Sequence, residues 1–106
     1  MINFDYRGNA IYFDNQSIEE ITKKIRSPFY CYSLKYLKDQ YNLLDNSIDL
    51  KNYQICYAVK SNSNQSIIKT FSNMGSGADV VSIGEIKRAL KANIPPEKIV
   101  FSGIGK

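Results

Sequence analysis

The residues best suited to chemistry in this chain are a lysine and the small polar residues that follow it. Lys60 ends the apolar run Tyr57–Val59, and Ser61 and Asn62 come directly after it. A lysine at the carboxyl end of a parallel strand lies where α/β proteins place their reactive groups. There its amine can condense with an aldehyde to form a Schiff base. From position alone, an ordinary surface lysine at a strand-to-helix turn is the simpler interpretation.

Two acidic residues accompany this lysine in the sequence. Asp79 lies inside an apolar run, and a carboxylate in such a place needs a partner, for which the Lys60 amine is suitable. Glu85 follows Ser82 by three positions, the spacing of a helix-capping box, which explains it without any ligand. Both acids fall at or just after a predicted strand end, so they are candidate site residues together with Lys60.

The elements that must position these residues alternate along the chain. Apolar or aromatic runs predict strands, and amphipathic segments that begin with Ser33, Asn64 and Ser82 as caps predict helices between them. Alternating strands and helices predict an α/β fold with a parallel sheet and right-handed crossovers. Both an open doubly wound sheet and the start of a (β/α)₈ barrel fit this pattern. The predicted strands are residues 29–32, 53–59, 78–81 and 99–101.

The first 28 residues have a different pattern. Two short strands flank a turn at residues 7–9, and a capping box at residues 17–20 opens a helix that should stop near Arg26, before Pro28. At the other end, the chain stops in a glycine-rich turn after the last strand, with no covering helix. Since a closed barrel needs about 250 residues, we expect the chain to be a fragment.

Composition narrows the classes of function. The net charge of +4 is mild and the basic residues are spread over predicted helices, so neither nucleic acid nor membrane is an expected partner. The chain has no histidine, which excludes histidine general-base chemistry within these residues. Two cysteines without histidine do not form a usual zinc site, so no metal is expected. We expect Cys31 and Cys56 to be buried and reduced.

The segment Tyr57–Asn62 resembles the cofactor-lysine motif of the fold-type III pyridoxal-phosphate decarboxylases, the family of diaminopimelate, ornithine and arginine decarboxylases. The resemblance continues in register through residues 77–86 and 94–103, and residues 27–30 are similar to an upstream motif of the same family. The ending at residues 102–106 most resembles the diaminopimelate decarboxylase branch, although Ile104 replaces the asparagine of many relatives.

The resemblance implies a fold and a site. The fold would be the N-terminal part of a (β/α)₈ TIM barrel, with residues 29–106 forming its first βα units and residues 1–28 belonging to a β domain. Lys60 would be the catalytic residue and hold pyridoxal 5′-phosphate as a Schiff base. Asp79 and Glu85 would lie close to that cofactor. The residues that bind the phosphate and pair with the pyridine ring would lie outside this chain.

The resemblance also implies an activity. The full-length enzyme would be a cytoplasmic homodimer that decarboxylates the amino acid meso-2,6-diaminopimelate to L-lysine. The isolated chain should be inactive and poorly soluble, because an incomplete parallel sheet exposes its edges and apolar faces. The alternatives are an ornithine or arginine decarboxylase, a non-catalytic α/β ligand-binding module, and a protein that carries pyridoxal phosphate without turnover.

Overall fold

The computed structural model describes residues 4–105. The chain divides into two compact units, Met1–Gln40 and Tyr41–Lys106, each of which is described by itself. Within residues 4–105, none of the helices combines the length and the apolar character that crossing a membrane requires.

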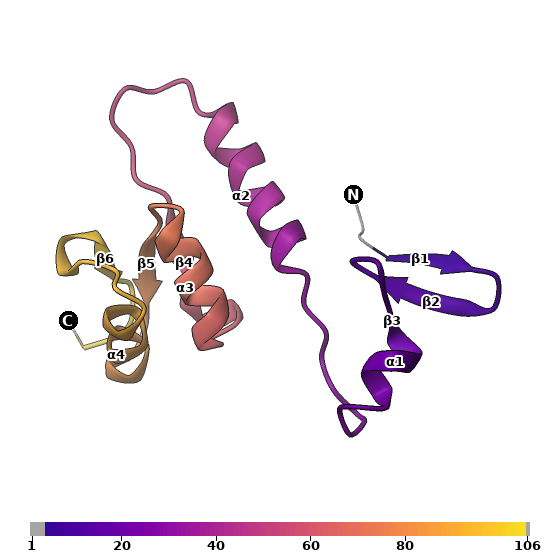
Figure 1. Cartoon of the computed structure of the whole chain (residues 1–106). Helices are drawn as coiled ribbons and strands as arrows, with labels where there is room; N and C mark the ends of the chain where they lie inside the picture. Colours follow the sequence, from indigo (N-terminus) through magenta and orange to yellow (C-terminus); the bar gives the residue numbers. More distant parts are fainter. Residues whose placement is uncertain (1–3, 106) are drawn as a thin grey trace. The chain divides into compact units, whose positions relative to one another are not determined.

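The first unit holds a small antiparallel sheet. Strands β1 (Phe4–Arg7) and β2 (Ala10–Phe13) form a hairpin, and the short β3 (Gln16–Ser17) pairs with β2 on its other side (Figure 1). Helix α1 (Ile18–Thr22) follows directly. The hairpin agrees with the sequence prediction, whereas β3 was not predicted, since two residues give no periodicity to read.

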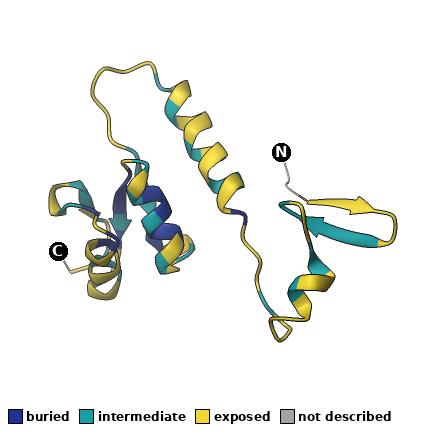
Figure 2. Ribbon diagram, viewed as in Figure 1, coloured by how far each residue is buried: buried dark blue, intermediate teal, exposed yellow. Residues whose placement is uncertain are grey.

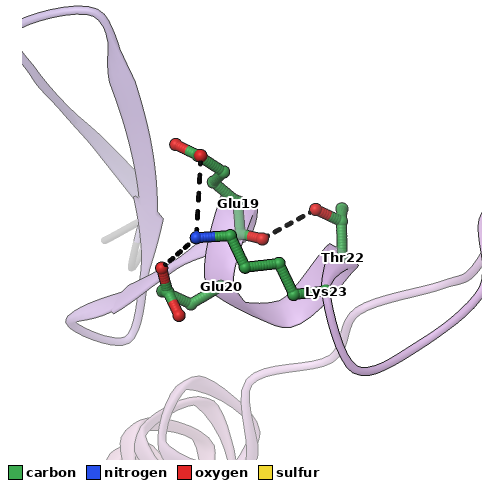
Figure 3. A network of polar contacts seen from close by, with 4 residues as sticks. All are labelled: Glu19, Glu20, Thr22 and Lys23. Carbon is green, nitrogen blue, oxygen red and sulfur yellow. Dashed lines mark hydrogen bonds and ion pairs between the residues drawn. The ribbon is translucent and has the colours of Figure 1, made fainter.

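The capping box predicted at the start of α1 is wrong. Ser17 is the N-cap residue but its side chain makes no capping hydrogen bond. The Glu20 carboxylate instead pairs with Lys23, whose Nζ lies 2.7 Å from Glu20 Oε1 and 3.8 Å from Glu19 Oε1 (Figure 3). The helix also ends at Thr22 rather than near Arg26, and none of its residues is buried. With no buried face, little holds additional turns in place.

The aromatic run at residues 29–32 was predicted as a strand, and that prediction is wrong for the described structure. The segment is extended but pairs with no other strand. Tyr30 and Tyr32 stack on each other, with ring centroids 6.2 Å apart, and Tyr30 is 89% exposed. Helix α2 (Leu34–Ser47) follows, and Ser33 caps it as predicted, because Ser33 Oγ accepts a hydrogen bond from the Tyr36 N–H.

The second unit is built from β–α units in one parallel sheet. Its strands are β4 (Cys56–Ala58), β5 (Gly77–Val80) and β6 (Ile99–Phe101), which lie in the order β4-β5-β6. Helix α3 (Gln65–Asn73) connects β4 to β5, and α4 (Ile83–Lys91) connects β5 to β6 (Figure 1). The short 3₁₀ helix η1 (Val59–Ser61) follows β4, and a second one, η2 (Pro96–Lys98), precedes β6. The predicted α/β fold with a parallel sheet is therefore confirmed.

Local signals set the ends of both helices. Asn64 Oδ1 accepts a hydrogen bond from the Ser66 N–H at the start of α3, and Ser82 Oγ accepts one from the Glu85 N–H at the start of α4. Gly75, with a φ of +91°, follows the C-cap Met74 of α3, the left-handed position that the sequence assigned to it. These caps fix where each helix begins relative to the strand before it.

The hydrophobic core lies on one face of the parallel sheet. Its fully buried members are Val59, Ile68, Ala78, Val80, Ala89, Ala92 and Ile94, which come from the strand ends, both helices and the segment after α4. Alternation along the strands places Cys56, Gly77, Asp79 and Val100 on the opposite face. Val100 there is 53% exposed, whereas the β5 residues on the core side are buried (Figure 2). We call the opposite face the open face.

Gly77 lets β5 approach its neighbours, and substituting it should destabilise the fold. A Cβ at this position would overlap the Lys98 carbonyl oxygen and lie 2.8 Å from Cys56 Sγ. We expect Gly77→Ala to lower the free energy of unfolding by about 1–3 kcal/mol, as measured by denaturant titration. The matched control is Gly84→Ala in α4, where the nearest atom lies 3.8 Å away. Equal stability of the two variants would contradict this packing.

The two cysteines should differ in reactivity. Both are free thiols, but Cys31 is exposed and Cys56 is half-buried, which corrects the expectation that both are buried. Burial, and to a lesser extent the Asp79 carboxylate, raises the pKa of the Cys56 thiol. Since the thiolate is the reactive form, we expect iodoacetamide at pH 8 to alkylate Cys31 several times faster than Cys56. Peptide mass mapping over time measures both rates, and faster labelling of Cys56 would contradict the structure.

Candidate active site

Lys60 lies in the middle of η1, immediately after β4. Its side chain is exposed, and within residues 4–105 its Nζ forms no hydrogen bond or ion pair. The turn that carries it contacts β5, the central strand of the sheet. The structure therefore places the Lys60 amine at the carboxyl end of a parallel strand, as the sequence predicted, and this amine is uncommitted among residues 4–105.

The backbone around Lys60 is held by side-chain hydrogen bonds. The Tyr57 hydroxyl donates to the Asn62 carbonyl oxygen at 2.8 Å, and Ser61 Oγ donates to the Ala58 carbonyl oxygen at 2.7 Å. Asn62 Oδ1 accepts a hydrogen bond from the Asn64 N–H at 3.0 Å. Asn62 thereby stabilises the turn into α3, a local role that its amide performs without any ligand.

Asp79 lies on the open face of β5, in register with Ala58 of β4 and Val100 of β6. Its partner is Ser102, whose Oγ donates to Asp79 Oδ1 at 2.5 Å, while the Ser102 N–H donates to the Val80 carbonyl oxygen. No ion pair joins Asp79 to Lys60 in the described part of the chain. The sequence interpretation, in which the Lys60 amine is the partner of Asp79, is therefore wrong. The partner is the Ser102 hydroxyl.

Glu85 caps α4, in a variant of the box that the sequence predicted. Its Oε2 accepts a hydrogen bond from the Val81 N–H at 2.7 Å, one residue before the Ser82 cap. Its own N–H donates to Ser82 Oγ at 3.2 Å. The carboxylate thus fixes the chain between the end of β5 and the start of α4, and it faces the same end of the sheet as the other candidates.

Parallel pairing brings these groups to one edge. Lys60 follows β4, Asp79 lies in β5 and Ser102 follows β6, so all of them come from the carboxyl-terminal portions of neighbouring strands. Sequence reasoning did not select Ser102, although its position directly after a predicted strand was a usable signal. Among residues 4–105, no group of three or more histidine, cysteine or acidic side chains is placed to hold a metal ion.

An amine and a carboxylate at one sheet edge suit carbonyl chemistry. A primary amine attacks an aldehyde to form a Schiff base, and a nearby carboxylate favours the positive charge that develops on nitrogen. A serine hydroxyl that donates to the carboxylate fixes its orientation. The open face beside these groups carries small side chains at Cys56, Ala58 and Gly77, and no helix of this unit contributes core residues to it.

Known proteins are similar to this chain in sequence and in fold. Residues 34–106 match the family described as "Pyridoxal-dependent decarboxylase, pyridoxal binding domain". A diaminopimelate decarboxylase from Helicobacter pylori strain J99 is 50% identical over 88 residues, which are 83% of this chain and 22% of that protein. The diaminopimelate decarboxylase of Aquifex aeolicus is 37% identical over 102 residues, 96% of this chain and 24% of that protein.

Solved structures agree with the sequence matches. The crystal structure of an Aquifex aeolicus protein has a TM-score of 0.91 at 36% identity, covering 98% of this chain and 26% of that one. Diaminopimelate decarboxylase from Helicobacter pylori, complexed with L-lysine, has a TM-score of 0.78 at 46% identity, covering 83% and 22%.

The family match has a defined extent. The chain spans about a quarter of the length of the relatives it matches. The matched residues contain the whole parallel sheet and Lys60, Asp79, Glu85 and Ser102. The resemblance read from the sequence motifs is thereby confirmed, and the chain belongs to the pyridoxal-dependent decarboxylases, of whose pyridoxal-binding domain residues 34–106 form a part.

Proposed function

We propose that this chain supplies the cofactor lysine of a pyridoxal-phosphate-dependent amino-acid decarboxylase that converts meso-2,6-diaminopimelate to L-lysine. The observation that carries the proposal is the uncommitted Lys60 amine on a hydrogen-bonded turn at the carboxyl edge of the sheet. Membership of the decarboxylase family supports the cofactor, and the names of the two curated relatives support the substrate.

The described residues fit one end of pyridoxal phosphate. Lys60 offers a primary amine with no competing partner among residues 4–105, which suits the aldehyde carbon of the cofactor. Asp79 and Ser102 lie at the same edge of the sheet, where they add a carboxylate and a hydroxyl to the amine. We assign no residue of this chain to the phosphate group of the cofactor.

Each candidate residue has a role in this proposal. When bound, pyridoxal phosphate supplies the electron sink that accepts the charge left by loss of CO₂. Lys60 would hold the cofactor by its aldehyde carbon through the side-chain amine. Asp79 would provide a negative charge at the same sheet edge as the Lys60 amine, in an orientation that Ser102 fixes. Glu85 holds the loop between β5 and α4 at the edge of the site.

The choice of substrate follows from the relatives. Both curated relatives described above are diaminopimelate decarboxylases, and one solved relative is complexed with L-lysine, the product of the proposed reaction. Because L-lysine is diaminopimelate without one carboxyl group, a site that holds it also provides the contacts for the rest of the substrate. The active enzyme would be cytoplasmic and homodimeric.

The architecture of the complete enzyme is part of the proposal. Residues 29–106 would form the first βα units of a (β/α)₈ barrel, and residues 1–28 would belong to a β domain. Two features support a barrel: both outer strands, β4 and β6, have an unpaired edge in this sheet, and the open face has no covering layer among the described residues. The chain alone would not complete the reaction.

Borohydride reduction tests the role of Lys60. Incubation of the full-length protein with pyridoxal phosphate, followed by borohydride, should fix the label on Lys60, and peptide mass mapping should locate it there. Lys60→Ala should lose the label. The control is Lys69→Ala, since Lys69 Nζ donates to the Ala92 carbonyl oxygen on the helical side of the sheet. A label on another lysine, or on none, would falsify the Schiff-base role.

A substrate panel tests the proposed reaction in the protein that contains this chain. With meso-diaminopimelate, ornithine and arginine as substrates, we expect CO₂ release from diaminopimelate with a kcat/KM at least about 100-fold higher than from the others, a specificity worth roughly 2.7 kcal/mol. Lys60→Ala should reduce turnover to background. Preference for ornithine or arginine would leave the cofactor role intact and overturn the substrate.

A further inference from the structure

We propose that the hydroxyl groups of Tyr57 and Ser61 position Lys60 for attack on the cofactor aldehyde, an inference that rests on the proposed function. We call these two hydroxyls and the carbonyl oxygens of Ala58 and Asn62 the hydroxyl clasp. The side chains of Tyr57 and Ser61 form hydrogen bonds to the backbone around Lys60 and not to its amine. They are therefore positioning residues rather than catalytic ones.

The clasp closes the turn on both sides of Lys60. The Tyr57 hydroxyl donates to the carbonyl oxygen of Asn62, two residues after Lys60, at 2.8 Å. Ser61 Oγ donates to the carbonyl oxygen of Ala58, two residues before Lys60, at 2.7 Å, and lies 3.2 Å from the Tyr57 hydroxyl. The two bonds therefore span the lysine from opposite directions, and the contact between Ser61 Oγ and the Tyr57 hydroxyl links them.

The core fixes the clasp in place. The Tyr57 ring packs on Phe71 of α3 with centroids 4.6 Å apart and an interplanar angle of 31°. Phe71 is only 8% exposed and also contacts the ring of Tyr41. Because the ring is held by the buried side of the sheet, its hydroxyl reaches the turn from a fixed point.

The clasp matters for Lys60 because little else orients that side chain. Among the described residues, the Lys60 amine has no hydrogen bond or ion pair, so its direction depends on the backbone of residues 59–61. A 3₁₀ turn has weaker hydrogen-bond geometry than an α-helix. Side-chain bonds to its flanking carbonyl groups therefore supply rigidity that the turn lacks by itself, and a preoriented nucleophile reacts faster.

The test removes one hydroxyl and keeps its ring. In Tyr57→Phe, we expect the rate of borohydride-trapped pyridoxal phosphate labelling at Lys60 to fall by about three- to tenfold, the range for one lost hydrogen bond. Amide hydrogen exchange of residues 60–62 should accelerate by a similar factor. Ser61→Ala should produce the same two changes, and Ser61→Thr, which keeps a hydroxyl, should restore both values.

The matched control is Tyr53→Phe. The Tyr53 hydroxyl donates to Asp45 Oδ1 at 2.8 Å, and neither residue belongs to the clasp. This variant loses the same chemical group and should retain the labelling rate of Lys60. Equal labelling by the unsubstituted chain and Tyr57→Phe, or an equal fall in Tyr53→Phe, would overturn the clasp while the proposed function stands. All of these variants are made in the full-length protein, and absence of any Lys60 label in the unsubstituted full-length protein would overturn both.

Discussion

The parallel pairing of β5 with β4 on one side and β6 on the other is the constraint on which the rest of the structure depends. In a parallel sheet all carboxyl ends lie at one edge, so residues far apart in the chain meet there without any further device. Lys60, Asp79 and Ser102 reach that edge from three separate strands. The pairing in turn requires Gly77, because its missing Cβ allows Cys56 and the Lys98 backbone to approach β5.

Local signals made most of the second unit predictable. The caps at Asn64 and Ser82 and the glycine at position 75 act through neighbours within a few residues, so a sequence pattern contains all the information they need. The strands β5 and β6 were predictable for a related reason, since short apolar runs bounded by turn residues are typical of buried strands. The start of β4 was placed too early, because Tyr53 and Ile55 share the apolar character of the strand although β4 begins only at Cys56.

The failures of prediction concern contacts between distant residues. The run at residues 29–32 has the composition of a buried strand, but composition does not supply a pairing partner. Asp79 was correctly expected to need a partner, and the chain offered several. The Ser102 hydroxyl, 23 positions away, became close only through the register of β5 and β6. The sequence placed Lys60, Asp79 and Glu85 at strand ends, whereas the hydrogen bonds of Tyr57 and Ser61 depend on how the turn folds back.

The two faces of the parallel sheet differ in the volume of their side chains. The core face carries Val59, Val80 and Phe101 against two helices, while the open face carries Cys56, Ala58 and Gly77 beside Asp79. A large apolar residue at Ala58 would thus add volume without entering the core. Because Cys56 and the Lys98 backbone occupy the space beside Gly77, the shape of the open face at β5 is set by the close approach of the strands rather than by bulky side chains.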